Sequence, residues 1–232
     1  MLVGLGVCFS AKTTIAQTQH DFELWGGIIA PIRFSKRLSI WNDAHFVPQA
    51  FFATRHGLTY HFTERLSITG GYAWVPTATS FSSKLIRNEH RPWGQIECEF
   101  NLFRKVTYRL RFRYDGRFRN RIEDLTVLND DYLFYSRLRL MHNFRFRLIE
   151  LNPETQLHFN LLNETLFNVG KQTDLPFFDQ HRVFGLIGVT RNYTTIQFGY
   201  HLRILPQNSA GFNRLNHGLT LWWIQLINIQ KR

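Results

Sequence analysis

The sequence predicts an all-β protein, an antiparallel up-and-down transmembrane β-barrel of 10–12 strands. Polar and apolar residues alternate strictly over long stretches, as in Thr107–Arg119, TYRLRFRYDGRFR. Alternation at period two is the mark of a strand whose two faces meet unlike environments. The alternating stretches are longer than the strands of most soluble sheets. Short and long connectors also alternate along the chain, which is typical of bacterial outer-membrane barrels.

Eleven alternating stretches follow one another along the chain. Crossing an apolar layer of ~25 Å at a tilt of ~40° takes about 10 residues, and most of the stretches reach that length. Helix caps followed by an apolar pattern of period 3.6 do not occur. The expected strands are Phe22–Phe34, Leu38–Phe46, Ala50–Phe62, Leu66–Val75, His90–Phe103, Thr107–Arg119, Tyr132–Arg147, Glu154–Phe167, Phe178–Thr190, Thr194–Leu205 and His217–Ile229.

The connectors between these strands predict which end of the barrel faces the cell exterior. Short connectors belong to the periplasmic end and long polar loops to the outside. Bacterial barrels of this type have an even number of strands, with both termini in the periplasm. We therefore expect 12 strands, either because Thr13–Asp21 adds a crossing or because one strand is split or merged in the pattern. The expected short connectors are Ser35–Arg37, Thr63–Arg65, Arg104–Val106, Leu148–Pro153 and Arg191–Tyr193, and the others are Val47–Gln49, Pro76–Glu89, Asn120–Asp131, Asn168–Phe177 and Pro206–Asn216.

The start of the chain resembles a secretory signal. Leu2–Phe9 is apolar, and Thr14-Ile15-Ala16 matches a small-x-small cleavage site. We expect residues 1–16 to be a signal peptide and residues 17–232 to form a single barrel domain. The expected location is the outer membrane of a Gram-negative bacterium, with outer-membrane lipid as a partner and other outer-membrane proteins as further candidate partners.

Composition and charge exclude several classes. The chain has 232 residues, 22 of them Phe, and no apolar run long enough for a membrane helix. A net charge of +11 in a soluble protein would suggest nucleic acid. Here the arginines occupy alternate positions within apolar strands and form no basic stripe on a loop or helix, so nucleic-acid binding is not expected. Cys98 lies on the apolar face of its strand beside Ile96 and Phe100 and is expected to be a small hydrophobic residue.

The cost of charge in lipid decides which face points inward. An arginine that faces lipid at mid-bilayer costs roughly 2–4 kcal/mol, so four on one strand would cost about as much as a whole domain's stability. The arginine face must therefore line the lumen. Besides their arginines, these strands place carboxylates and a glutamine on the same face. The expected lumen-lining residues are Glu89, Arg91, Gln95, Glu97, Glu99, Arg109, Arg111, Arg113, Asp115, Arg117, Arg137, Arg139, Arg145, Arg147, Glu164, Arg182 and Arg203.

The pattern also predicts ion pairs between adjacent strands and aromatic residues at the two ends of the barrel. A hairpin at Arg104–Val106 places Glu97 and Glu99 opposite Arg109 and Arg111, which predicts cross-strand ion pairs. Aromatic residues near strand ends are expected to form an interfacial girdle. The girdle residues are Trp25, Trp41, Trp74, Trp222, Trp223, Tyr60, Tyr72 and Tyr200.

These features favour a non-enzymatic barrel, either a narrow anion-preferring pore or a structural partner in an outer-membrane complex. One alternative is a barrel-embedded hydrolase of the lipase or protease type, for which Ser82, Ser83, His90 and Glu89 lie close in sequence. Another is a soluble periplasmic barrel that binds an anionic ligand, which would need a polar outer face. No catalytic residue, cofactor or metal site is expected.

An ordered set of short motifs resembles the bacterial family called domain of unknown function 2490. The resemblance implies an outer-membrane barrel and supplies no activity. At the first motif, Gly94 stands where the family usually has Gln. The matching pieces are Glu89–Gln95, Tyr108–Tyr114, Arg137–Leu140, Asn163-Glu164, Phe178–Arg182, Phe198–Tyr200 and Asn216-His217.

Overall fold

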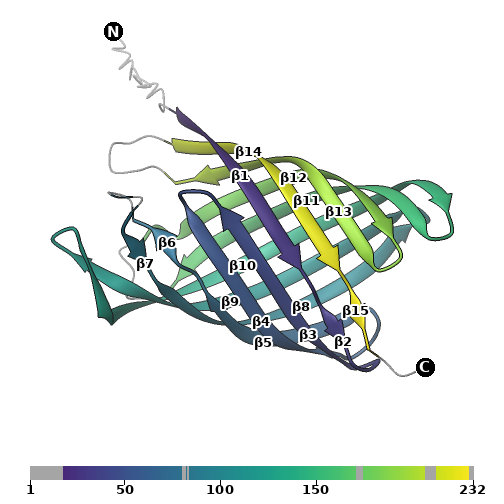
Figure 1. Ribbon diagram of the computed structural model, residues 1–232, viewed down its shortest axis with the longest axis horizontal. Coiled ribbons are helices and arrows are strands. Elements are labelled where there is room, and N and C mark those ends of the chain that lie inside the picture. The colour runs from purple at the N-terminus through teal and green to yellow at the C-terminus, as the bar shows by residue number, and fades with distance from the viewer. Residues whose placement is uncertain (1–17, 80–81, 83, 171–174, 207–212, 230–232) are drawn as a thin grey trace, which may run out of the picture.

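The chain forms a closed barrel of eleven long strands (Figure 1). The computed structural model describes residues 18–79, 82, 84–170, 175–206 and 213–229. No helix occurs within these ranges, so none there could cross a membrane. The long strands are β1 (Thr18–Ile29), β3 (Leu38–Val47), β4 (Phe51–His61), β5 (Leu66–Trp74), β8 (Glu89–Phe103), β9 (Val106–Glu123), β10 (Thr126–Asn152), β11 (Thr155–Val169), β12 (Phe178–Arg191), β13 (Thr194–Leu205) and β14 (Asn213–Gln225).

Four short strands complete the sheet. β2 (Ile32–Arg33) continues the course of β1 beyond Pro31, and β15 (Ile227–Asn228) continues that of β14. β6 (Thr77–Ala78) and β7 (Ile86–Arg87) form a small hairpin in the connector between β5 and β8. The eleven alternating stretches of the sequence therefore correspond one to one to the long strands.

The barrel closes through a parallel pair, and the preference for 12 strands is wrong. β1 pairs with β14 in parallel from Thr18↔Asn213 to Ile29↔Ile224, whereas the other neighbouring long strands are antiparallel. An odd number of up-and-down strands must close in this way. Parallel pairing is only slightly less stable per residue than antiparallel pairing, so hydrogen bonding does not enforce an even number.

The expected loop Asn120–Asp131 is instead part of a long hairpin. β9 and β10 continue past the barrel rim and pair as far as Glu123↔Thr126, with an irregularity between Leu128 and Tyr132. Asp124 and Leu125 turn the chain with positive φ angles of 46° and 61°. At the other end β10 runs through the expected connector to Asn152, where Pro153 and Glu154 make the turn.

The two ends of the barrel differ in their connectors. The short-turn end holds the connectors that follow β2, β4, β8, β10 and β12. The long-loop end holds the connectors that follow β3, β5, β11 and β13, together with the β9–β10 hairpin. β1 begins at the long-loop end, and β15 finishes at the short-turn end (Figure 1).

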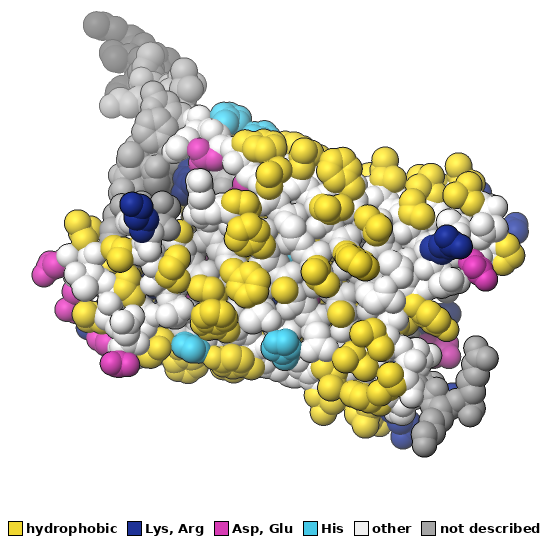
Figure 2. Space-filling view, viewed as in Figure 1, with side chains coloured by type: hydrophobic (Ala, Val, Ile, Leu, Met, Phe, Trp, Pro, Cys, Tyr) yellow, Lys and Arg dark blue, Asp and Glu magenta, His cyan; other side chains and the backbone are white. Residues whose placement is uncertain are grey.

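Alternate residues point to opposite faces of the barrel wall. Large apolar side chains such as Phe22, Ile96, Phe112, Ile187 and Phe198 are exposed on the outside. On the side drawn in Figure 2, hydrophobic side chains spread across the middle of the wall, while charged side chains gather towards its two ends. This distribution matches a wall that contacts an apolar layer between two aqueous phases.

Candidate functional site in the barrel lumen

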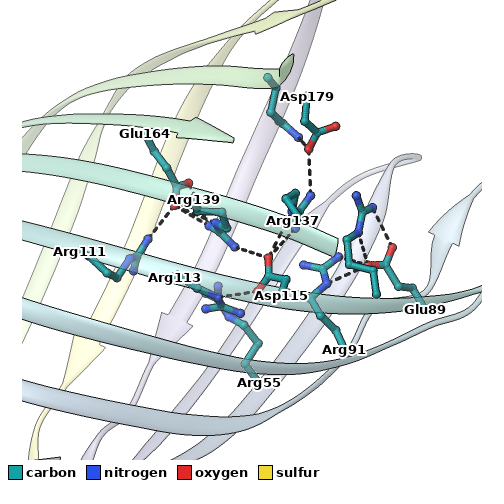
Figure 3. Close-up of polar contacts among 12 residues, drawn as sticks. Arg55, Glu89, Arg91, Arg111, Arg113, Asp115, Arg137, Arg139, Glu164 and Asp179 are labelled. Carbon is teal, nitrogen blue, oxygen red and sulfur yellow. Dashed lines mark hydrogen bonds and ion pairs between the residues drawn. The ribbon is translucent and has the colours of Figure 1, made fainter. Parts of the chain in front are cut away.

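The centre of the lumen is a network of arginines and carboxylates. Asp115 of β9 is fully buried, and one of its oxygens accepts a hydrogen bond from Arg113 Nε at 2.7 Å. Its other oxygen accepts from Arg137 Nη2 at 2.9 Å and lies 3.5 Å from Arg139 Nη1. Figure 3 shows these three arginines converging on Asp115 from β9 and β10. One carboxylate therefore holds two neighbouring strands together from inside.

Two glutamates repeat this arrangement. Glu164 of β11 accepts from Arg139 at 2.7 Å and Arg111 at 2.8 Å, and Arg182 of β12 lies 3.4 Å away. Glu89 lies within 3.2 Å of three further arginines, Arg91, Arg117 and Arg119. Four strands, β9 to β12, are thus linked through Glu164 alone. Charge-assisted bonds of this kind are about twice as strong as neutral ones.

Of the two ion pairs expected across the hairpin, the one between Arg109 and Glu99 forms, and Glu97 pairs with Arg109 instead of Arg111. The register places Glu99 opposite Arg109 and Glu97 opposite Arg111, as predicted. Arg109 binds both glutamates, at 2.7 Å from Glu99 and 3.5 Å from Glu97. Arg111 instead reaches Glu164, two strands away. Strand register predicts ion pairs between residues directly opposite each other on adjacent strands. It does not predict contacts between side chains of strands that are not adjacent.

Aromatic side chains form the other side of the lumen. Three tryptophans expected in the interfacial girdle, Trp25, Trp41 and Trp222, face inward instead. Trp25 is buried and packs edge-on against Phe51 and Phe184, at centroid distances of 5.5 and 5.6 Å. Trp222 packs 5.2 Å from Phe184. Trp41 also faces inward and donates to the buried Asp43 at 2.5 Å. Parity along the strand could have found Trp25, because it shares a face with Glu23 and not with Leu24.

The remaining predicted girdle residues point outward. Trp74, Trp223, Tyr72 and Tyr200 are exposed on the outer wall, and Tyr60 lies 4.9 Å from Phe62 in an edge-on contact. Tyr72 and Tyr200 hydrogen bond to His90 and His217 respectively. An aromatic side chain with a polar tip suits the border between an apolar layer and water.

A cavity of about 840 Å³ lies between the charged wall and the aromatic wall. Its lining runs from Glu89, Arg119 and Arg203 near the long-loop end to Asn101 and Leu226 near the short-turn end. Of the predicted lumen-lining residues, Gln95, Arg113 and Asp115 are buried behind the cavity wall. Those that line the cavity are Glu89, Arg91, Glu97, Glu99, Arg109, Arg111, Arg117, Arg137, Arg139, Arg145, Arg147, Glu164, Arg182 and Arg203.

The structure does not bring the candidate hydrolase residues together. Glu89 points into the lumen, whereas its neighbour His90 bonds to Tyr72 on the outer wall. The carbonyl of Ser82 accepts from Thr79 at 2.7 Å, and Ser83 lies outside the described residues. In the described part of the chain, no three His, Cys, Asp or Glu residues cluster as metal ligands would. The predicted signal peptide, residues 1–16, also lies outside the described residues.

Comparison with known proteins identifies the family and nothing closer. No curated protein and no solved structure matches the chain. One family model does match, the protein of unknown function DUF2490, and it covers residues 22–216. That range includes all the ion-pair networks described above. The chain therefore belongs to the DUF2490 family.

Proposed function

We propose that this protein is a non-enzymatic outer-membrane β-barrel whose lumen is a narrow, anion-preferring passage. The observation that carries the proposal is the lining of the cavity. Among the described residues that line it, twelve are arginines and four are glutamates. Rings of one charge sign set the selectivity of a pore, and an excess of arginine favours anions. A role as a structural partner in an outer-membrane complex stays a prediction.

The outer wall supports placement in a membrane. Exposed apolar residues occur on every long strand from β1 round to β14. A soluble protein rarely exposes contiguous apolar patches larger than a few hundred Å². Apolar outward positions and charged inward positions are the arrangement that a membrane barrel needs. The same arrangement argues against the soluble periplasmic alternative.

The location and orientation are tested by labelling single cysteines in intact cells. Leu125 is 67% exposed at the tip of the β9–β10 hairpin, and Lys105 is exposed in a short turn at the opposite end. In a background with Cys8→Ser and Cys98→Ser, we expect Leu125→Cys to react with an impermeant maleimide on whole cells. Lys105→Cys should react only after the outer membrane is permeabilised. Equal labelling of both, or recovery of the protein without detergent, would contradict the proposed placement.

A further inference from the structure

Arg145 and Arg147, at the short-turn end of the lumen, differ from the other described arginines of the cavity in having no carboxylate partner. Among the described residues, ten of the twelve cavity-lining arginines have a carboxylate within 4.0 Å. Arg145 and Arg147 of β10 have none. Their side chains project from the same face of one strand, two residues apart. Like charges held side by side are unfavourable unless an anion lies between or beside them.

The hydrogen bonds of these two arginines involve neutral groups. Arg145 donates to Thr190 Oγ1 at 3.0 Å and lies 3.2 Å from His158 Nδ1. Arg147 donates to the carbonyl oxygen of Arg104. The Nε atoms of both arginines are buried and have no partner. A buried donor without an acceptor carries a desolvation cost that a bound anion would remove.

Neighbouring polar groups extend the set of unpartnered atoms. Asn143 precedes Arg145 on the same face of β10. Asn160, on the neighbouring strand β11, stands directly opposite Arg145. Each has a buried Oδ1 without a partner. Both line the cavity beside the two arginines. The Nδ2 groups of the two asparagines can donate to the oxygens of a carboxylate, whereas their Oδ1 atoms are acceptors that a carboxylate cannot satisfy.

The opposite side of the same mouth is apolar. Trp222, Ile224 and Leu226 line it from the end of β14 onward, and Ile29 and Pro31 line it from the end of β1. In the strand order of the barrel, β1 lies five strands from β10 in one direction and six in the other, so the two face each other. One mouth thus offers a cationic wall and an apolar wall across a shared space.

We propose that the short-turn mouth of the lumen binds an amphipathic carboxylate. Its headgroup lies against Arg145 and Arg147, and its apolar chain lies along Trp222 and Ile224. A small inorganic anion would satisfy the arginines and leave the apolar wall in contact with water, whereas a neutral apolar molecule would leave the arginines unpaired. The site rests on the proposed passage of anions through this lumen and adds the chemical class of the anion.

Calorimetric titration of the purified barrel in nonionic detergent tests the site, with empty micelles as the blank. The probes are octanoate, acetate, octan-1-ol and octyltrimethylammonium, which separate the contributions of charge and chain. We expect octanoate to bind at least tenfold more tightly than each of the others. Octanol or the octyl cation binding as tightly as octanoate would overturn the proposal, and this comparison needs no variant.

Variants locate the site within the barrel. Arg145→Gln with Arg147→Gln should weaken octanoate binding at least tenfold. The matched control, Arg37→Gln with Arg65→Gln, removes two exposed charges from turns at the same end and should leave binding unchanged. Ile224→Thr should weaken octanoate about fourfold and leave acetate unaffected. Equal loss in the control pair would overturn the assignment.

The test is independent of conduction, because it is made in micelles. Octanoate binding without any current in lipid bilayers would overturn the passage and support the site. Anion current with no octanoate binding would support the passage and overturn the site. Each variant is compared with the wild type by its heat-modifiable migration in gels, so that loss of binding is not confused with loss of folding.

Discussion

Asp115→Asn is expected to abolish barrel assembly or to lower the free energy of unfolding by about 3–5 kcal/mol. Asp115 has no exposed surface and balances Arg113, Arg137 and Arg139. Asparagine has nearly the same size and keeps an oxygen acceptor, but it carries no charge. Arg113 would then lose its carboxylate partner in a buried site, whereas Arg137 and Arg139 would keep Asp179 and Glu164. Urea titration of vesicle-inserted protein, followed by tryptophan fluorescence, measures the loss.

Asp131→Asn is the matched control for this substitution. Asp131 pairs with Arg121 at 2.9 Å, but its side chain is 44% exposed on the β9–β10 hairpin. An exposed ion pair contributes about 0–1 kcal/mol because water and salt screen it. If the two variants lose the same stability, the central network does not hold β9 and β10 together as described.

Phe112→Arg is expected to cost about 2–4 kcal/mol in a lipid bilayer. Phe112 points outward from the middle of β9, is 46% exposed, and pairs with Ile96 and Leu140 on the neighbouring strands. An arginine there would have to enter the apolar layer. The measurement is the free energy of folding into phospholipid vesicles, read from the denaturant dependence.

Leu125→Arg provides the control on the same hairpin. Leu125 is more exposed than Phe112 but lies beyond the barrel rim, so an arginine there should change stability by less than about 0.5 kcal/mol. A soluble barrel would tolerate both substitutions equally well. Equal and small effects of Phe112→Arg and Leu125→Arg would therefore contradict a lipid-facing wall.

Most of the fold follows from the period-two pattern. The stretch Thr107–Arg119 alternates so strictly that its two faces and its register with Glu97 and Glu99 can be predicted. Where the pattern ended, the prediction failed. Asn120–Asp131 mixes polar and apolar residues on both faces and resembles a loop, yet β9 and β10 stay paired there after leaving the barrel.

The strand number depends on a contact that the local pattern does not contain. The sequence shows eleven alternating stretches, whereas bacterial barrels generally have an even number of strands. The parallel ladder between β1 and β14 involves residues nearly two hundred positions apart, and nothing local in either segment indicates its direction. Local alternation predicts that a residue lies in a strand, but it does not predict how the first and last strands meet.

The sequence predicts which charged residues face the lumen, but it does not predict which of them form ion pairs. Parity assigned arginines and glutamates to the inward face, but the contact between Arg111 and Glu164 crosses two strand spacings. The aromatic wall is not predicted, because the position of tryptophans near strand ends also fits an interfacial girdle. For Trp25 and Trp222, the face shared with polar neighbours was the better guide to burial.

The reversal potential of single channels in planar lipid bilayers tests the proposed passage most directly. With potassium chloride at unequal concentrations on the two sides, the account predicts a reversal potential of the sign given by chloride permeating faster than potassium. In the part of the chain that the structure describes, twelve arginines against four glutamates line the cavity and cause that preference. Preference for potassium, or no conductance from folded and inserted barrel, would contradict it.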